Sequence, residues 1–178
     1  MWSPQLIPGP LQSEEYARAV MRALRPDLDD EAIDAEVQVR LKRGRLLRQR
    51  GGLRGWFVMG ESAVRCPVGG PQQMRRALQH LLKVVDGNPR VQVQILPIDA
   101  GEHAGMEGGI SILEFELPAP TIAHVEYPSG AAWLEKPSDI ERATLTFDHV
   151  LAAALDPQVS IGCIEQLVRE MGEVDGSQ

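Results

Sequence analysis

Apolar residues recur at helical spacing through the first third of the chain. Residues 1–12 are rich in proline and are predicted to form an extended arm, because proline fixes φ and restricts the residue before it. Ser13 is a typical N-cap, and the spacing that follows it predicts a helix over 13–24. A second helix is predicted from residue 29 or 30 to about residue 49.

A two-residue period, typical of half-buried strands, dominates the middle of the chain. The segment 61–71 is predicted to be a turn-rich connection. Because strands joined by short connections cannot pair in parallel, the last strands favour an antiparallel meander. Strands are predicted over 53–59, 91–98, 110–117 and 121–127, with 131–135 as a further candidate.

Three more helices are indicated by their start signals. Pro71 follows two glycines and opens a helix as its first residue. Ser138 and Glu141 have the spacing of a capping box, and Pro157 opens the last helix. Residues 172–178 are expected to fray.

These elements follow one another without an internal repeat or a linker. We therefore predict a single α+β domain over residues 1–178, with N-terminal helices, a central antiparallel β-meander of about four to five strands and two C-terminal helices. The composition agrees with a folded chain, since 43% of the 178 residues are hydrophobic and 24% are charged.

The charge balance argues against a dedicated nucleic-acid binder. There are 18 Lys and Arg against 25 Asp and Glu, a net charge of −7. Residues 40–54 hold seven of the 18 basic residues, and we interpret them as a solvated helix end paired with acidic neighbours. No direct contact with nucleic acid is predicted for this chain.

The cellular compartment is predicted from the disulfide, membrane-span and secretory-signal features that the sequence lacks. Cys66 and Cys163 are too few for a disulfide framework, and no apolar run reaches the length of a membrane span. The first residues have no basic start and contain three prolines, unlike a secretory signal. We predict a cytoplasmic protein that does not contact a membrane.

Candidate chemistry centres on histidines and carboxylates. His124 and Glu126 lie two apart on a predicted strand and so share a face. With His103 or Glu102 they could supply metal ligands or an acid–base pair, although polar residues are also normal on the wet face of an antiparallel sheet. We predict no metal and no cofactor. If the chain is an enzyme, the acid–base candidates are His103, His124, Glu126 and Glu61.

Two other features could contribute to a binding site. The glycine-rich loop 100–109 lacks the Lys-Ser/Thr pair of a phosphate loop and is predicted to be a hairpin or lid loop. Trp56 and Trp133 fall in predicted strands, where they pack in the core or, if they share a face, line a small apolar pocket. The ligand-binding candidates are Trp56, His103, His124 and Trp133.

Several separately spaced motifs are similar to one known family. They occur in order as PGPLQSEEYARAV (8–20), VQVRLKRGRLL (37–47), ESAVRCPVGGPQQMRRALQHLL (61–82), VQVQILPIDAGEHAGMEGGISILEF (91–115), HVEYPSG (124–130) and TFDHVLAAALDPQVSI (146–161). Together they closely resemble the C-terminal domain of unknown function of actinobacterial antitoxin-like transcriptional regulators.

The resemblance implies which domain and partner accompany this one in the family, and it shows where this sequence differs from its relatives. In those regulators an Xre-type helix-turn-helix normally precedes this domain, and a small partner protein is often encoded beside them. The resemblance begins almost at Met1, so we expect either a regulator's C-terminal domain alone or a stand-alone copy. Gly44 stands where the family usually has glutamine, and inside a helix it costs about 1 kcal/mol relative to alanine.

Three functional hypotheses follow. The first is a non-catalytic regulatory domain that binds a small-molecule effector or a small partner protein, as the resemblance implies. The second is a stand-alone copy that acts as a small biosynthetic enzyme, performing a cyclisation or rearrangement in an apolar pocket. The third is a dimerisation or antitoxin-like scaffold, for which a homodimer is left open.

Overall fold

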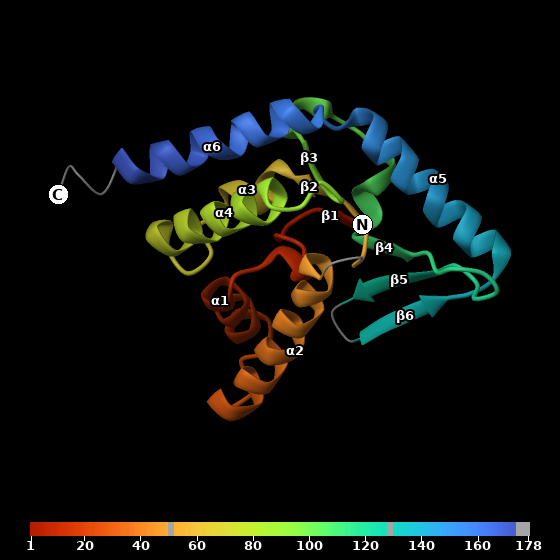
Figure 1. The fold of residues 1–178 in the computed structure, drawn as a ribbon, viewed down its shortest axis with the longest axis horizontal. Helices are drawn as coiled ribbons and strands as arrows, with labels where there is room; N and C mark the ends of the chain where they lie inside the picture. The colour runs from red at the N-terminus through yellow and green to blue at the C-terminus, as the bar shows by residue number, and fades with distance from the viewer. Residues whose placement is uncertain (50–51, 128–129, 174–178) are drawn as a thin grey trace.

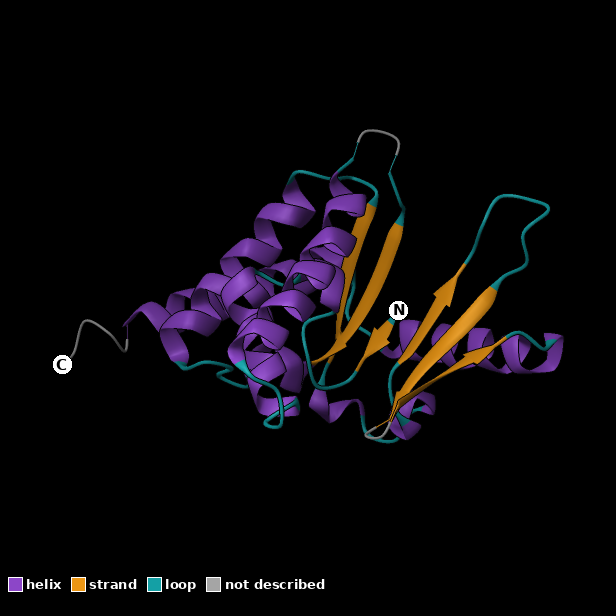
Figure 2. Cartoon of the chain, turned by 90° about the horizontal axis from the view of Figure 1, so that it is seen from below, coloured by secondary structure: helices purple, strands orange, loops and turns teal. Residues whose placement is uncertain are grey.

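The computed structural model describes residues 1–49, 52–127 and 130–173, which form a six-stranded sheet with helices on both faces (Figures 1 and 2). The predicted α+β class is confirmed, with two helices after the last strand. The strands are β1 (Trp2–Ser3), β2 (Gly55–Gly60), β3 (Val91–Leu96), β4 (Ile110–Leu113), β5 (Ile122–Tyr127) and β6 (Gly130–Leu134). The α-helices are α1 (Glu14–Leu24), α2 (Asp30–Arg48), α3 (Glu61–Arg65), α4 (Pro71–Asp86), α5 (Pro137–Ala153) and α6 (Pro157–Glu173). Short 3-10 helices are η1 (Gly9–Leu11), η2 (Ile98–Ala100) and η3 (Ala104–Glu107).

The sheet is mixed rather than wholly antiparallel. Its order is β3-β2-β1-β4-β5-β6; β4, β5 and β6 form the predicted meander, whereas β1, β2 and β3 pair in parallel. The parallel half exists because α3 and α4 lie between β2 and β3, which gives the chain the crossover that parallel strands require. The predicted meander includes β3, which instead pairs in parallel with β2, and β1 lies in the predicted extended arm.

The proline-rich arm supplies the central strand of the sheet. Trp2 pairs in parallel with Val58 of β2 and in antiparallel with Ile110 of β4. The Trp2 side chain is 3% exposed, and its indole Nε1 donates a hydrogen bond of 2.9 Å to the carbonyl of Gly105. This two-residue strand is therefore the seam that joins the parallel and antiparallel halves.

The two halves of the sheet differ in what covers them. One face of β2 and β3 lies in the main core with α1, α2, α4 and α6, and the other joins Trp2 in a smaller cluster against α5. Helix α5 also packs against β4 and β5 and crosses behind the meander in Figure 2. On the face of β5 and β6 opposite α5, no helix of the described residues makes a comparable contact.

Several local predictions are confirmed and others corrected. Ser13 caps α1, and Asp29 caps α2 by accepting from the Ala32 amide at 2.9 Å. The prediction that Ser138 and Glu141 form a capping box is wrong. Pro137 suits the first helical position, so α5 starts one residue before Ser138. The segment predicted as a turn-rich connection contains α3.

The structure also differs from the prediction in the glycine-rich loop and in the C-terminal tail. The glycine-rich loop 100–109 is neither a hairpin nor an open lid, because η3 lies inside it and packs against α5. Helix α6 continues to Glu173, and the rest of the predicted frayed tail lies outside the described residues. Within the described ranges, no helix is both long and apolar enough to cross a membrane.

Gly44 has a packing role that its helix propensity hides. A Cβ at this position would lie 2.8 Å from the carbonyl oxygen of Pro10 in η1, closer than real Cβ contacts. Glycine therefore lets α2 approach the turn that holds the N-terminal segment. The close approach of α2 to Pro10 therefore explains why glycine occurs here despite its low helix propensity.

Replacing Gly44 with alanine should lower the free energy of unfolding by about 1–2 kcal/mol, because overpacking against a backbone carbonyl outweighs the gain of about 1 kcal/mol in helix propensity. Gly162 in α6 is the matched control, since a Cβ there meets no atom within 4 Å. Gly162→Ala should stabilise the protein. Urea denaturation of both variants measures the effects, and a stabilised Gly44→Ala protein would contradict this account.

Candidate functional site

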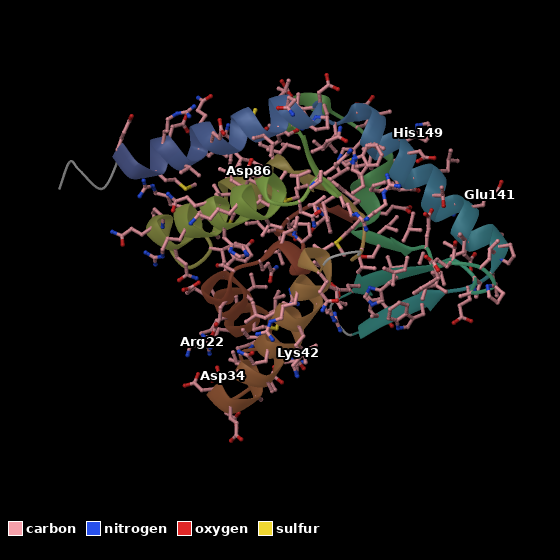
Figure 3. The ribbon with its side chains drawn as sticks, viewed as in Figure 1. Arg22, Asp34, Lys42, Asp86, Glu141 and His149 are labelled. Carbon is pink, nitrogen blue, oxygen red and sulfur yellow. The ribbon has the colours of Figure 1, made fainter. Side chains whose placement is uncertain are left out.

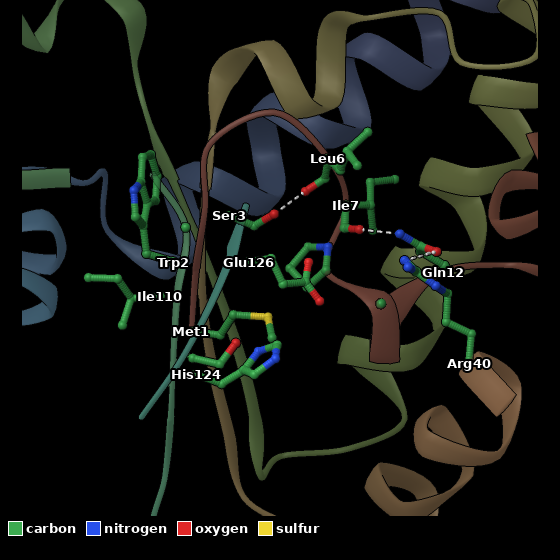
Figure 4. A pocket seen from close by; sticks show the side chains of 14 residues that line it. Met1, Trp2, Ser3, Leu6, Ile7, Gln12, Arg40, Ile110, His124 and Glu126 are labelled. Atoms are coloured by element: carbon green, nitrogen blue, oxygen red, sulfur yellow. Dashed lines mark hydrogen bonds between the residues drawn. The ribbon is translucent and has the colours of Figure 1, made fainter. Parts of the chain in front are cut away.

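A pocket of about 110 Å³ lies where the N-terminal segment meets α2 and the meander (Figure 4). One wall comes from the N-terminal segment and α2, and the other from β4 and β5. The floor is formed by β1 at the seam of the sheet. The polar lining side chains are Ser3, Gln12, Arg40, Ser111, His124 and Glu126.

Arg40 is held in one wall by a chain of hydrogen bonds. Its Nη1 donates to Oε1 of Gln12 at 3.3 Å, and Nε2 of Gln12 donates to the carbonyl of Ile7 at 2.6 Å. Gln12 is 4% exposed, so both of its polar ends are satisfied inside the protein. Gly9 lies beside Arg40 in the same wall.

The segment that carries this wall is anchored by Tyr16. The Ile7 amide donates to the Tyr16 hydroxyl at 3.1 Å, and the Tyr16 side chain is fully buried. Burial is the main cause that raises the pKa of Tyr16. The hydroxyl therefore stays neutral and holds the Ile7 backbone in place. The Ile7 carbonyl then holds Gln12, and Gln12 holds Arg40.

The opposite wall comes from β5 and its neighbours. His124 pairs with Ser111 on β4 and with Trp133 on β6, and His124 and Trp133 have ring centroids 4.4 Å apart at an interplanar angle of 45°. Glu126 is on the same face of β5, two residues further along. A polar pocket thus continues directly onto an exposed aromatic surface.

Opposite charges contribute to the pocket from its two walls. Burial lowers the pKa of the Arg40 guanidinium, and Glu126 is the largest favourable charge acting on it. Among the described residues no ion pair includes Arg40. The pocket therefore suits a small polar group that can accept hydrogen bonds from the guanidinium and donate to the carboxylate, such as a peptide unit or an amide side chain.

The face that continues from the pocket is open. Trp133 is 56% exposed, although tryptophan is normally well covered in a folded core. Ala123, on the other face of the same strands, is fully buried on the α5 side. The meander therefore has one packed face and one uncovered face, and we call the latter, which bears His124, Glu126 and Trp133, the open face.

Residues 1–166 match a family model described as Domain of unknown function (DUF5753). This chain belongs to that family. The match confirms that the chain is a domain of unknown function, which is the coarser part of the resemblance seen in the sequence. Neither the curated proteins nor the solved structures gave a match.

The DUF5753 domain brings together only part of the predicted site. His124 and Glu126 share a face and line the pocket, as their spacing predicted, and Trp133 packs on His124. His103 lies on the other side, where its ring meets Trp2 edge to face at 5.5 Å and its Nδ1 accepts from the Gly105 amide. Within the described ranges no group of three or more His, Cys, Asp or Glu could hold a metal ion.

Trp56 and Trp133 do not line a common pocket. Strands β2 and β6 are separated in the sheet by β1, β4 and β5. Trp56 donates from Nε1 to Gln94 Oε1 at 2.7 Å, and Gln94 in turn reaches the carbonyl of Leu155. The two tryptophans therefore do not form the predicted apolar pocket, because three strands lie between theirs.

Lys42, Arg43 and Arg45 of the basic run are exposed, and no acidic partner of theirs is found among the described residues. Arg18 pairs with Asp34 and Arg22 with Asp30, so α1 pairs with two of the four carboxylates in the first half of α2. Figure 3 labels Arg22 and Asp34 near the start of α2 and Lys42 further along it. No ion pair among the described side chains includes a basic residue of the second half of α2, because α1 does not continue beside it.

Glu61 has a structural role away from the pocket. Its Oε2 accepts from the Ile98 amide at 2.9 Å and its Oε1 accepts from Nε of Arg65 at 2.5 Å. The Ile98 hydrogen bond, followed by that from Arg65, lowers the pKa of Glu61. A carboxyl group that stays ionised and bonded in this way is unsuited to donate a proton near neutral pH.

Glu61 should contribute to the pH dependence of stability. Because its pKa is lower in the folded than in the unfolded state, its stabilisation is complete above about pH 4.5 and is lost as the pH falls through the folded pKa. Chemical denaturation at several pH values should show a steeper acid loss for the wild type than for Glu61→Gln. Identical slopes for the two proteins would refute the assignment.

Sequence reasoning missed Arg40 and Gln12. Arg40 falls on the same helical face as the buried residues Ile33 and Val37, and a basic residue on an apolar stripe is the signal that could have found it. The sequence pattern instead groups Arg40 with the basic run. Gln12 had no such signal, because it lies in the proline-rich arm and only the tertiary fold buries it.

Proposed function

We propose that this DUF5753 domain is a non-catalytic regulatory module that binds a partner at the pocket and the open face. The resemblance to the C-terminal domains of Xre-type regulators supports a role in relaying a signal in the cytoplasm. In such a role a partner protein or a small effector would change the behaviour of a DNA-binding unit. This chain would supply the binding step and would not contact nucleic acid itself.

The geometry favours a partner polypeptide over a small-molecule effector. A pocket of about 110 Å³ is well below the usual size of a small-ligand site, about 300–1,000 Å³. It lies beside an uncovered sheet face on which Trp133 is 56% exposed. Tryptophan is enriched among the residues that dominate protein interfaces. The observation that carries the proposal is this continuity between a polar pocket and an exposed aromatic face.

The test is co-expression with the polypeptides encoded by the flanking reading frames. Any polypeptide that co-purifies is then titrated into the domain by calorimetry to measure its affinity. We expect a complex that Trp133→Ala and Arg40→Ala each weaken at least tenfold. Glu165→Gln on the exposed surface of α6 is the control and should leave the affinity unchanged. If no flanking product binds, or if both site variants bind like the wild type, the proposal fails.

One observation favours a small enzyme as the second candidate. The pocket brings His124 and Glu126 together opposite Arg40, an arrangement that could move a proton on a small substrate. On this alternative, His124→Ala and Glu126→Ala would abolish turnover while leaving the melting temperature within a few degrees. Turnover that survives both substitutions would exclude these residues as the acid–base pair.

A further inference from the structure

The two edge strands of the sheet, β3 and β6, differ in whether other described residues bond to their outer side. At the β3 edge, the Ile95 amide donates to Ser160 Oγ at 2.9 Å and the Leu155 amide donates to the carbonyl of Ile95 at 2.9 Å. Gln94 adds a side-chain bond to Leu155. The connection from α5 to α6 and the first turn of α6 thus cover this edge, which protects it from pairing with another chain.

The β6 edge has no such cover in the part of the chain that the structure describes. Strand β6 pairs with β5 on one side, and no hydrogen bond joins its other side to any described residue. Its sequence, GAAWL, contains no charged residue and no proline, the usual devices that block an exposed edge. The edge is short but is available for an added strand.

The surface around this edge is acidic and aromatic. Residues 110–135, which span the meander, contain four Glu and no Lys or Arg, and Lys136 follows directly. Trp133 lies on the edge strand itself, and Glu126 and Glu135 are both exposed nearby. At the far end of the meander, Phe115 is 53% exposed and Leu117 is 93% exposed. Carboxylates beside an exposed indole form a surface to which lysine and arginine side chains are attracted.

We propose that the β6 edge binds an extended, lysine- or arginine-bearing strand of a partner polypeptide by strand addition. This rests on the proposed function and names the chemistry of its partner. The main chain of the added strand pairs with β6, and its basic side chains on the open face lie next to Trp133 and Glu126. Apolar side chains on the alternate positions face the α5 side.

A second copy of this chain fits the edge poorly. Pairing β6 with β6 would bring together two copies of a meander that has four Glu and no Lys or Arg over 110–135. Like charges facing each other across an interface cost binding free energy. A basic partner strand meets no such repulsion, so charge complementarity selects it over self-association.

The test uses acetylated and amidated octapeptides, (Lys-Val)4, (Glu-Val)4 and (Ser-Val)4, titrated into the full chain by calorimetry. We expect (Lys-Val)4 to bind at least tenfold more tightly than the other two. Hydrogen exchange should slow at the amides of 130–134 when it is bound. A fully N-methylated (Lys-Val)4 keeps the charge but cannot pair as a strand, and it should not bind.

Protein variants separate the contributions of charge and edge. Glu126→Gln and Trp133→Ala should each weaken (Lys-Val)4 at least threefold, whereas the α6 control Glu165→Gln should not change its affinity. Equal binding of the three charge types, or binding of the N-methylated peptide, would overturn the inference. So would a failure of (Lys-Val)4 to bind, or a concentration-dependent dimer that Trp133→Ala abolishes.

These outcomes do not decide the proposed function. A partner found by co-expression that loses affinity in Trp133→Ala and Arg40→Ala supports binding at the open face whatever the octapeptides do. If that partner binds there but (Lys-Val)4 does not, only strand addition by a basic segment is rejected.

Discussion

Replacing Trp2 with alanine should lower the free energy of unfolding by about 3–5 kcal/mol. Trp2 is 3% exposed and packs with Val58, Leu96 and Val150. Its removal leaves a cavity at the seam and also leaves the Gly105 carbonyl without the indole N–H that it accepts from. Because β1 joins the two halves of the sheet, the loss weakens both at once.

Urea denaturation monitored by circular dichroism measures this effect. Trp2→Phe keeps most of the apolar contact but not the N–H donor, so its loss should be smaller than that of Trp2→Ala. Trp56→Ala is the matched control, since Trp56 is 45% exposed and its loss should stay well below that of Trp2→Ala. A loss below about 1 kcal/mol for Trp2→Ala would contradict the role of β1 as the seam.

Replacing Tyr16 with alanine should also cost about 3–5 kcal/mol, because it empties a fully buried aromatic site. The substitution has a second consequence that a core cavity alone would not have. The Ile7 amide loses its acceptor, and Ile7 is the residue whose carbonyl holds Gln12 and, through it, Arg40. The pocket wall should therefore loosen together with the core.

Tyr16→Phe isolates that second consequence. It keeps the ring and removes only the hydroxyl, and leaving the buried Ile7 amide unpaired should cost about 1–3 kcal/mol. Hydrogen exchange at residues 7–12 should become faster in this variant, while exchange in α6 should not change. Unchanged stability and exchange would show that the Tyr16 hydroxyl does not anchor the segment.

Local signals predicted much of the secondary structure because their causes are local. Ser13 and Asp29 cap their helices through side-chain bonds to amides only three residues away. The alternation in 122–127 correctly placed His124 and Glu126 on one face, because strand geometry alone fixes that relation. Such predictions require no knowledge of which elements meet in space.

The remaining features depend on long-range pairing, which one sequence does not reveal. Trp2 bonds to Gly105 across 103 residues of sequence, and the backbone around it pairs with β2 and β4, so the predicted extended arm supplies the central strand. The same pairing puts His103 beside Trp2 and away from His124, so the predicted cluster of histidines does not form. Arg40 became a pocket residue only because η1 and α2 pack together.

The most direct test of a partner site on the open face is hydrogen exchange of this domain, free and in complex with the partner found by co-expression. Binding at the proposed site should slow exchange in β4, β5 and β6 and around Arg40. The outer surfaces of α4 and α6 should exchange as in the free protein. Protection confined to α4 and α6, with β5 and β6 unchanged, would contradict the account.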